Sequence, residues 1–361
     1  MGKKICKLAS VFLIITLVLP AVTYAADYNE YSAPVNDPGY KEQWGPEFIR
    51  GPAVPTYGIV IAVIDSGIYR GHPDLYNVNI LPGRNFIVST CGYCRRCGFC
   101  ILNLTRPVYD TDDESGHGTY VTGVIAATIG NVIDTASDAY GVTIMPLRVA
   151  TGVNNFIRYS AVAAAIHYAV EEGVHIINIS LGTVVASPAV RGAVDHAAAN
   201  GVWMVAAAGN YGHINGGTAS MYPASFADVI GVGTITRYGQ RWYRSQQNDS
   251  VFVVMPGENI LTTGLSDYTS KDEGTSLSAP KITALAAIAR TFDPDMPKAA
   301  FRNMLIDSAI PKGYPTHDAD NRRVRNDQYG YGVVDAGLFM YNLTRRNYID
   351  FIDAEAGAPC I

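Results

Sequence analysis

The sequence predicts an α/β protein with a doubly wound, mostly parallel sheet that carries helices on both faces. Continuous apolar runs, typical of buried parallel strands, alternate with longer segments in which apolar residues recur every three or four positions. Right-handed crossovers between such strands place helices on both faces, and ligands bind beyond the carboxyl ends of the strands. The composition is that of a globular protein, since 48% of the 361 residues are hydrophobic and 16% are charged.

The expected strands and helices alternate along the chain. Six apolar runs are predicted to form strands, at residues 59–64, 142–149, 174–179, 202–208, 229–235 and 251–254. The Ala-rich segments 157–171 and 188–200 have apolar residues at helical spacing and are predicted to be helices. Further helical patterns begin after Gly116 and Gly274. The first of these places Val121, Val124, Ile125 and Thr128 on one face.

The N-terminus has the features of a cleaved secretory signal peptide over residues 1–25. A pair of lysines precedes an apolar run from Leu8 to Leu19, and the small residue Ala25 follows. A membrane anchor is the alternative, but about a dozen apolar residues fall short of the roughly 20 that a spanning helix needs. We therefore expect a secreted, extracellular protein whose mature chain begins near Ala26, with no later segment that spans a bilayer.

The charge balance gives no reason to expect a nucleic-acid partner. The formal net charge is −5, whereas binding to a nucleic-acid duplex usually needs a basic face. A protein or a small molecule is therefore the expected partner.

Four cysteines, Cys91, Cys94, Cys97 and Cys100, stand at strict three-residue spacing. Thiolates at this spacing can hold zinc or an iron–sulfur cluster, or they can form two disulfide bonds within a loop. Outside the cell, oxidation favours disulfide bonds. The four residues are therefore disulfide candidates, and one of the five cysteines beyond the signal peptide is left over unless two chains pair.

Three motifs contain residue types suited to acid–base and nucleophilic chemistry. Asp65 ends the first predicted strand, where an acid can also simply cap a turn. His117 lies between two glycines at a helix start, which exposes its ring as a general base requires; a capping histidine is the alternative. Ser276 begins the last helical pattern, where serine is usually a cap but where the helix end also stabilises negative charge. Thr275 and Ser278 compete with it on composition, and position in the motif favours Ser276.

The three motifs together are more specific than any one of them. They follow in the order Asp65, His117, Ser276, which is the order of the subtilisin type of protease. On these residues the chain resembles the subtilisin-like serine proteases, or subtilases, over about residues 44–336. Further segments that carry the resemblance are HPDL at 72–75, NISLG at 178–182, AAAGN at 206–210, YPAS at 222–225, PGENI at 256–260, YGYG at 329–332 and VDA at 334–336.

The resemblance implies a secreted serine endopeptidase that needs no cofactor for its chemistry. Ser276 would attack a peptide carbonyl, His117 would take and return the proton, and Asp65 would orient the imidazole. Asn210 would donate its side-chain amide to the tetrahedral oxyanion; a turn residue after Gly209 is the alternative.

The resemblance also implies where a substrate binds, as an extended strand added to a sheet edge. The expected substrate-binding residues are Ser180, Leu181, Gly182, Ala207, Ala208 and Gly209. Met221 stands where the family often has a very small residue. Our hypothesis is that it fills the base of the first specificity pocket and favours small or medium side chains, although methionine is also a common filler of gaps.

Other positions leave alternatives open. Relatives often bind calcium for stability, but loop carboxylates such as Asp74 and Asp112 are too unspecific to assign a metal site. The acidic run at 112–114 could attract basic substrate residues and raise the pKa of His117, or it could be a solvated acidic loop. The departures from the family pattern, which affect the shape of the cleft rather than the chemistry, are Tyr120, Thr183 and Lys281.

The expected organisation has one main domain. A signal peptide at 1–25 and a short lead at 26–43 precede a subtilisin-like peptidase domain at 44–345, which has a Cys-rich insertion at about 89–105; a tail follows at 346–361. Two alternatives to a broad endopeptidase stay open: a processing protease of narrow specificity, and a catalytically silent binding module with the same fold. An α/β-hydrolase fits less well, because its acid follows its serine. The oligomeric state is left open.

Overall fold

The computed structural model describes residues 35–51, 54–87, 91–93, 100–102, 109–133, 135–137, 139–151, 157–265 and 270–356. The expected signal peptide lies outside the described residues, as do Cys94, Cys97 and Cys360. None of the described helices combines the length and the apolar character that crossing a membrane requires.

A ten-stranded sheet forms the centre of the molecule. Its strands run in the order β15 (Ala309–Ile310), β16 (Val333–Val334), β12 (Val253–Pro256), β11 (Val229–Ile235), β10 (Trp203–Ala207), β9 (Ile176–Ile179), β2 (Val60–Asp65), β8 (Thr143–Arg148) and β3 (Asn79–Ile80), with β4 (Arg84–Asn85) also paired to β8. Every pair is parallel except β15 with β16. The predicted mostly parallel sheet is therefore confirmed.

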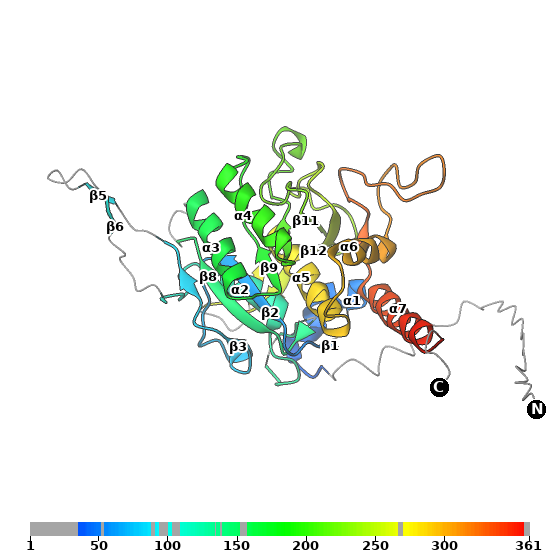
Figure 1. Ribbon diagram of the computed structural model, residues 1–361, viewed down its shortest axis with the longest axis horizontal. Helices are drawn as coiled ribbons and strands as arrows, with labels where there is room; N and C mark the ends of the chain where they lie inside the picture. The colour runs from blue at the N-terminus through cyan, green and yellow to red at the C-terminus, as the bar shows by residue number, and fades with distance from the viewer. Residues whose placement is uncertain are drawn as a thin grey trace, which may run out of the picture.

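Helices cover both faces of this sheet. On one face α3 (Tyr159–Glu171) and α4 (Pro188–Ala199) lie side by side, as Figure 1 shows in green. On the other face α2 (His117–Ala126) packs against α5 (Thr275–Phe292), which crosses strands β9 to β12. Helix α5 is buried on nearly all sides, and apart from Lys281 and Arg290 its residues are uncharged and mostly apolar or small. The doubly wound architecture follows from these two helical layers.

The strand sequences explain the two layers. In β2, Ala62 and Ile64 pack among the side chains of α3 and α4, whereas Ile61 and Val63 pack on the side of α2 and α5. Successive side chains of a strand point to opposite faces, and both faces are covered here. Because both faces of β2 are buried, its residues before Asp65 are apolar without a break and do not alternate with polar residues.

The other elements lie outside this sheet. They are α1 (Trp44–Ile49), β1 (Val54–Pro55), β5 (Cys91–Tyr93), β6 (Cys100–Leu102), β7 (Ala139–Tyr140), β13 (Ile260–Thr262), β14 (Ser270–Asp272), α6 (Lys298–Asp307), α7 (Ala336–Ala356) and the 3-10 helices η2 (Pro38–Glu42), η3 (Pro73–Leu75) and η4 (Asn215–Gly217). Strand β1 pairs with β7 in parallel, while β5 with β6 and β13 with β14 form antiparallel pairs.

Most predicted boundaries are displaced by one or two residues, and three differences from the sequence pattern are informative. The last predicted strand, 251–254, is displaced to Val253–Pro256, because Val251 is buried in the turn that closes on Asn248 before pairing begins. Helix α2 ends at Ala126, so Thr128 lies beyond it and donates its hydroxyl to the Asp74 carbonyl at 2.8 Å. Helix α7 continues without a break across residue 345, the expected end of the peptidase domain, although no helix was predicted there.

Candidate active site

The candidate site lies at the carboxyl edge of the central strands. Strand β2 ends at Asp65, β9 ends just before Ser180, and β10 ends just before Ala208. These strands are neighbours in the sheet, with Ile64 paired to Ile179, so their carboxyl ends lie together. Two helices, α2 and α5, also begin at this edge. Segments far apart in the sequence therefore meet where ligands of open parallel sheets bind.

Asp65 and His117 are in direct contact. Nδ1 of His117 lies 2.8 Å from Oδ1 of Asp65, which also accepts a hydrogen bond from the Ser66 amide at 2.7 Å. The Asp65 side chain is buried, and its Oδ2 has no hydrogen-bond partner among the described residues. A Cβ atom at Gly118 would lie 2.1 Å from the carbonyl oxygen of Gly67, so only glycine lets this helix start approach the end of β2 so closely.

Ser276 lies in the first turn of α5 and lines the same cavity as Asp65 and His117. Its Oγ donates to the carbonyl of Ser180 at 3.0 Å, and the Ser180 hydroxyl donates in return to the Ser276 carbonyl at 2.8 Å. The serine hydroxyl is thus directed to Ser180 rather than to His117. Catalytic hydrogen bonds are often unformed in a free enzyme, and rotation about the serine χ1 angle redirects such a hydroxyl.

Thr275 holds the Asn210 side chain beside Ser276. From the sequence, Thr275 was only a competitor of Ser276 for the role of nucleophile. Oδ1 of Asn210 accepts hydrogen bonds from the Thr275 amide at 2.9 Å and from the Thr275 hydroxyl at 2.8 Å. The side-chain nitrogen lies over Gly274, where a Cβ atom would approach it to 2.9 Å. Thr275 therefore orients the amide of Asn210. The signal in the sequence that could have indicated this role is the position of Thr275 immediately before Ser276.

One cavity of about 340 Å³ joins these groups. Asp65, His117, Asn210 and Ser276 all line it, together with Arg244. The expected substrate-binding residues that also line it are Ser180, Leu181, Gly182, Ala207, Gly209 and Met221. Ala208 is fully buried and does not line the cavity, because it continues the sheet and donates its amide to the Val232 carbonyl at 3.0 Å.

Met221 fills the space between the two walls of this cavity. Its side chain is 3% exposed. A Cβ atom at Gly182 on one wall would lie 3.6 Å from Met221 Cε, and one at Gly209 on the other wall would lie 2.6 Å from Met221 Cγ. The thioether is therefore packed between the backbones of both segments.

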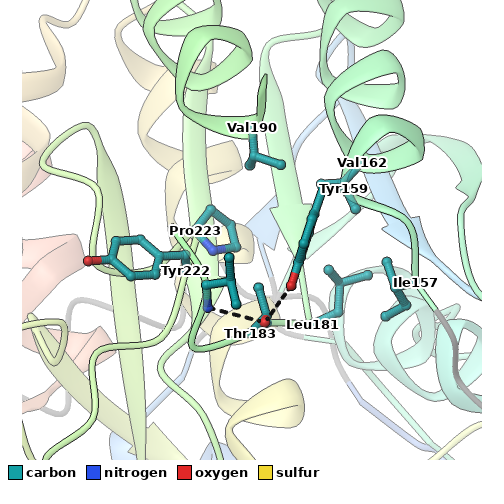
Figure 2. A pocket seen from close by; sticks show the side chains of 10 residues that line it. Ile157, Tyr159, Val162, Leu181, Thr183, Val190, Tyr222 and Pro223 are labelled. Carbon is teal, nitrogen blue, oxygen red and sulfur yellow. Dashed lines mark hydrogen bonds between the residues drawn. The ribbon is translucent and has the colours of Figure 1, made fainter. Parts of the chain in front are cut away.

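A second, apolar pocket of about 200 Å³ lies on the other side of Leu181. Figure 2 shows Tyr159 and Val162 of α3, Val190 of α4 and Pro223 around this pocket, whereas the ring of Tyr222 extends away from it. The Tyr159 hydroxyl and Thr183 Oγ1, 3.2 Å apart, mark its polar edge. Together the two cavities flank the segment 180–183.

Electrostatics around His117 favour the imidazolium. Burial lowers its pKa, but the charge and hydrogen bond of Asp65 and the charges of Asp272 and Asp113 raise it, to about 9 in total. The side chain is 36% exposed, so water reduces the cost of carrying the charge. The upward direction therefore follows from three carboxylates around one ring.

Asp74, one of the carboxylates considered for calcium, does not fit such a site. Asp74 is fully buried, and its oxygens accept hydrogen bonds from Asn131 Nδ2 at 3.0 Å and from the amide and hydroxyl of Thr135 at 3.1 and 3.0 Å. Burial raises the pKa of Asp74, against the effect of these hydrogen bonds. A calcium ion needs converging oxygen ligands rather than N–H and O–H donors. Within the described ranges, no cluster of three or more His, Cys, Asp or Glu side chains could hold a metal.

The clustered cysteines are described only in part. The backbone of Cys91 in β5 pairs with Leu102, and that of Tyr93 pairs with Cys100 in β6. Cys94 and Cys97 lie outside the described residues.

Comparisons with known proteins give one answer. A model of the subtilase family matches residues 56–332. The chain is 32% identical over 298 residues to the major intracellular serine protease of Bacillus subtilis (strain 168), covering 81% of this chain and 85% of that protein. It is 29% identical over 317 residues to an alkaline protease of Alkalihalobacillus alcalophilus, covering 86% and 73% respectively.

Solved structures agree with the sequence comparisons. A structure of proteases from Pseudoalteromonas arctica superposes with a TM-score of 0.67 at 25% identity, and it covers 86% of this chain and 100% of that one. The family match spans most of the chain and includes every segment that lines the cavity. The chain therefore belongs to the subtilase family and is a serine-type endopeptidase.

Proposed function

We propose that this protein is a secreted endopeptidase in which Asp65, His117 and Ser276 form a catalytic triad and Asn210 contributes to the oxyanion hole. The observation that carries the proposal is the 2.8 Å contact between Asp65 and His117 at the wall of a cavity that Ser276 and Asn210 also line. A buried carboxylate against one ring nitrogen leaves the other nitrogen free to exchange protons with a hydroxyl.

In the proposed reaction Ser276 Oγ attacks the carbonyl carbon of the scissile peptide bond while His117 Nε2 takes the hydroxyl proton. Asp65 stabilises the imidazolium that forms. The carbon–nitrogen bond then breaks, and His117 gives the proton to the leaving amine. A water molecule repeats the sequence on the acyl-enzyme: His117 takes its proton, and Ser276 leaves with that proton restored.

The oxyanion of each tetrahedral intermediate would be bound by the Asn210 side-chain amide and the Ser276 backbone amide. The two hydrogen bonds from Thr275 to Asn210 Oδ1 support this role. They hold the side-chain oxygen of Asn210 in place, so the side-chain nitrogen is the atom that can donate to the oxyanion. Preorganised donors of this kind are worth about 10²- to 10³-fold in turnover each.

The substrate would bind as an extended strand along Ser180, Leu181 and Gly182, and its affinity would come mainly from main-chain hydrogen bonds. Met221 would restrict the side chain that precedes the cleaved bond to small or medium size, because it occupies the space between Gly182 and Gly209. Such a restriction also favours the narrower alternative, a processing protease that cleaves few partners.

Replacing Met221 by glycine tests the pocket proposal. The test compares peptides that have phenylalanine or alanine immediately before the cleaved bond. Met221→Gly is expected to raise the ratio of kcat/KM for phenylalanine over alanine by about tenfold or more, since each added methylene in an apolar pocket is worth about 1–3 kcal/mol. A preference that does not change would show that Met221 is only a filler of the core.

The remaining parts of the proposal concern the compartment. Secretion rests on the charged, apolar and small-residue pattern of residues 1–25, and disulfide bonds among Cys91, Cys94, Cys97 and Cys100 suit an oxidising environment. One relative is named an intracellular protease, so the N-terminal sequence of the mature protein is the deciding measurement. No metal or organic cofactor takes part in the proposed steps.

A fluorophosphonate probe tests the mechanism directly. The probe phosphonylates an activated serine, so wild type is expected to be labelled at Ser276 and to lose peptidase activity in proportion. Ser276→Ala is expected to give neither labelling nor hydrolysis. A wild-type protein that folds but takes no label would support the silent binding module instead.

A further inference from the structure

The acidic run before His117 is only partly a solvated loop. Asp112 is exposed, and Glu114 is 44% exposed and pairs with the buried Arg148 at 2.9 Å. Asp113 differs from both neighbours because its carboxylate is directed inward, to groups on either side of the Asp65–His117 contact. The three adjacent acids therefore have different surroundings: Asp112 faces solvent, Glu114 pairs with Arg148, and Asp113 accepts hydrogen bonds near the Asp65–His117 contact.

We propose that Asp113 is a positioning residue that fixes His117 against Asp65. The inference rests on the proposed function of those two residues. Asp113 Oδ1 accepts hydrogen bonds from the Ser66 hydroxyl at 2.9 Å, the Ser115 amide at 3.0 Å and the Gly116 amide at 2.9 Å. Its Oδ2 accepts from the Thr119 amide at 2.9 Å and the Thr119 hydroxyl at 2.7 Å. One carboxylate thus binds the end of β2 and the start of α2 together.

Ser66 completes a closed set of hydrogen bonds around the pair. Its amide donates to Asp65 Oδ1 at 2.7 Å, its hydroxyl donates to Asp113, and that same hydroxyl accepts from the Gly118 amide at 2.9 Å. The residues next to Asp65 and next to His117 are therefore bonded to one another and to Asp113. A displacement of the His117 backbone relative to the end of β2 must break this set.

The local backbone explains why such a clamp is needed. His117 begins α2 between Gly116, which has φ of 87°, and Gly118, so the chain around it has no side chains to limit its motion. Gly116 supplies no side-chain cap to the helix. Asp113 takes over this function for the Gly116 and Thr119 amides, and its negative charge suits a helix N-terminus.

The same carboxylate acts on the charge of His117. The charged groups around the ring are Asp65 on β2, Asp113 before α2 and Asp272 on β14, while Arg244 lines the same cavity. Removing the charge of Asp113 should therefore lower the pKa of His117, and loosening the contact between His117 and Asp65 should lower it as well. Ser66→Ala keeps the charge of Asp113 and loses only hydrogen bonds of the clamp, so it separates positioning from charge.

The test compares Asp113→Asn with Asp112→Asn, which removes one negative charge from the same loop without breaking the clamp. Asparagine offers one acceptor oxygen where the clamp needs two, and it turns an N–H donor toward other donors. We expect Asp113→Asn to lower kcat by about 10- to 100-fold with KM within about twofold, because small misplacements of catalytic groups have effects of this size. The acid limb of its pH profile should move to lower pH, and Asp112→Asn should match wild type in both.

Two further measurements keep the test decisive. If Asp113→Asn does not fold, Ser66→Ala breaks the link to β2 alone and should lower kcat about fivefold or more. Titration of ¹⁵N-labelled His117 by NMR reports its pKa and its bond to Asp65 without any substrate. An active wild type in which Asp113→Asn behaves like Asp112→Asn overturns the positioning role. A wild type that neither cleaves nor takes label, but in which the pKa of His117 falls in Ser66→Ala, overturns the proposed function and keeps the positioning role.

Discussion

Thr275 illustrates how a single hydroxyl can support catalysis without reacting. It donates to Asn210 Oδ1 at 2.8 Å and accepts from the Gly209 amide at 3.1 Å, so it fixes both the side chain and the strand end that carries it. Thr275→Val removes both bonds with little change in shape. We expect kcat to fall by about tenfold or more with little change in KM, since the oxyanion exists only after attack.

The conservative variant serves as the control. Thr275→Ser keeps the hydroxyl and should retain most of the wild-type kcat in the same peptide assay. Equal losses in the valine and serine variants would contradict this role of the hydroxyl, because the serine variant keeps it.

His117 sets the expected pH dependence. A general base must be neutral, and the pKa of His117 is raised to about 9 by Asp65, Asp272 and Asp113 against the effect of burial. We therefore expect kcat/KM to be low near neutral pH and to rise into the alkaline range. Asp272→Asn should move that rise to lower pH. A rise centred at or below the ordinary histidine pKa of about 6.5 would contradict this assignment.

The raised pKa of His117 affects stability and activity in opposite directions as the pH rises. Because the folded-state pKa of His117 lies above its unfolded value, the ion pair with Asp65 stabilises the fold fully below about pH 6.5. That contribution is lost as the pH rises through the folded-state value. The free energy of unfolding of Ser276→Ala, measured across this range, should fall where activity in wild type rises.

At the level of elements, α5 is attached to β9 by a short chain of buried hydrogen bonds. The Thr283 hydroxyl donates to Asn178 Oδ1 at 2.8 Å, and Asn178 Nδ2 donates to the Ser180 hydroxyl at 3.0 Å. Ser180 in turn donates to the Ser276 carbonyl. The position of the helix that carries the nucleophile is therefore coupled to the strand that borders the cleft.

Thr283→Val tests this coupling. It leaves Asn178 Oδ1 buried without its donor, which should cost about 1–3 kcal/mol in the free energy of unfolding. Thr291→Val on the same helix is the matched control, because the Thr291 hydroxyl only returns to the Ala287 carbonyl within α5. Urea unfolding of both variants measures the difference, and equal losses would show that the link to β9 contributes nothing.

How far the sequence predicts the fold depends on where each element buries its side chains. Strands β2, β8, β9, β10, β11 and β12 are buried on both faces, so their apolar runs were visible without any structure. Strands β15 and β16 have two residues each and helix α7 has a mixed sequence, so neither gave a periodic signal. Tertiary contacts, not local preference, determine these elements.

The site divides in the same way. Asp65, His117 and Ser276 were predictable because each lies in a dense local motif at a strand end or helix start. The hydrogen bonds of Thr275 and Asp113 cross between segments, and a sequence pattern does not show which acid or hydroxyl is directed inward. The spacing likewise could not show that the Asp74 carboxylate would be occupied by N–H and O–H donors.

For the molecule as a whole, the end of α1 and the start of α7, which are far apart in the sequence, lie together. Arg50, at the end of α1, forms two hydrogen bonds with Asp335 through Nε at 2.9 Å and Nη2 at 2.5 Å. Asp335 also precedes α7, where its Oδ1 accepts the Leu338 amide at 2.8 Å. Figure 1 shows α1, in blue, near the start of α7, in red. One carboxylate therefore caps the last helix and joins it to the first.

Substitutions at the two partners should have unequal effects. Arg50 is 49% exposed, so Arg50→Ala should lower the free energy of unfolding by no more than about 1 kcal/mol, as for other surface ion pairs. Asp335 is 7% exposed, and Asp335→Ala removes the helix cap as well, which should raise the loss to about 2–3 kcal/mol. Urea unfolding in a Ser276→Ala background measures both values without self-digestion. Equal losses would mean that the ion pair alone accounts for the effect of Asp335, whereas a larger loss for Asp335→Ala assigns the difference to the start of α7.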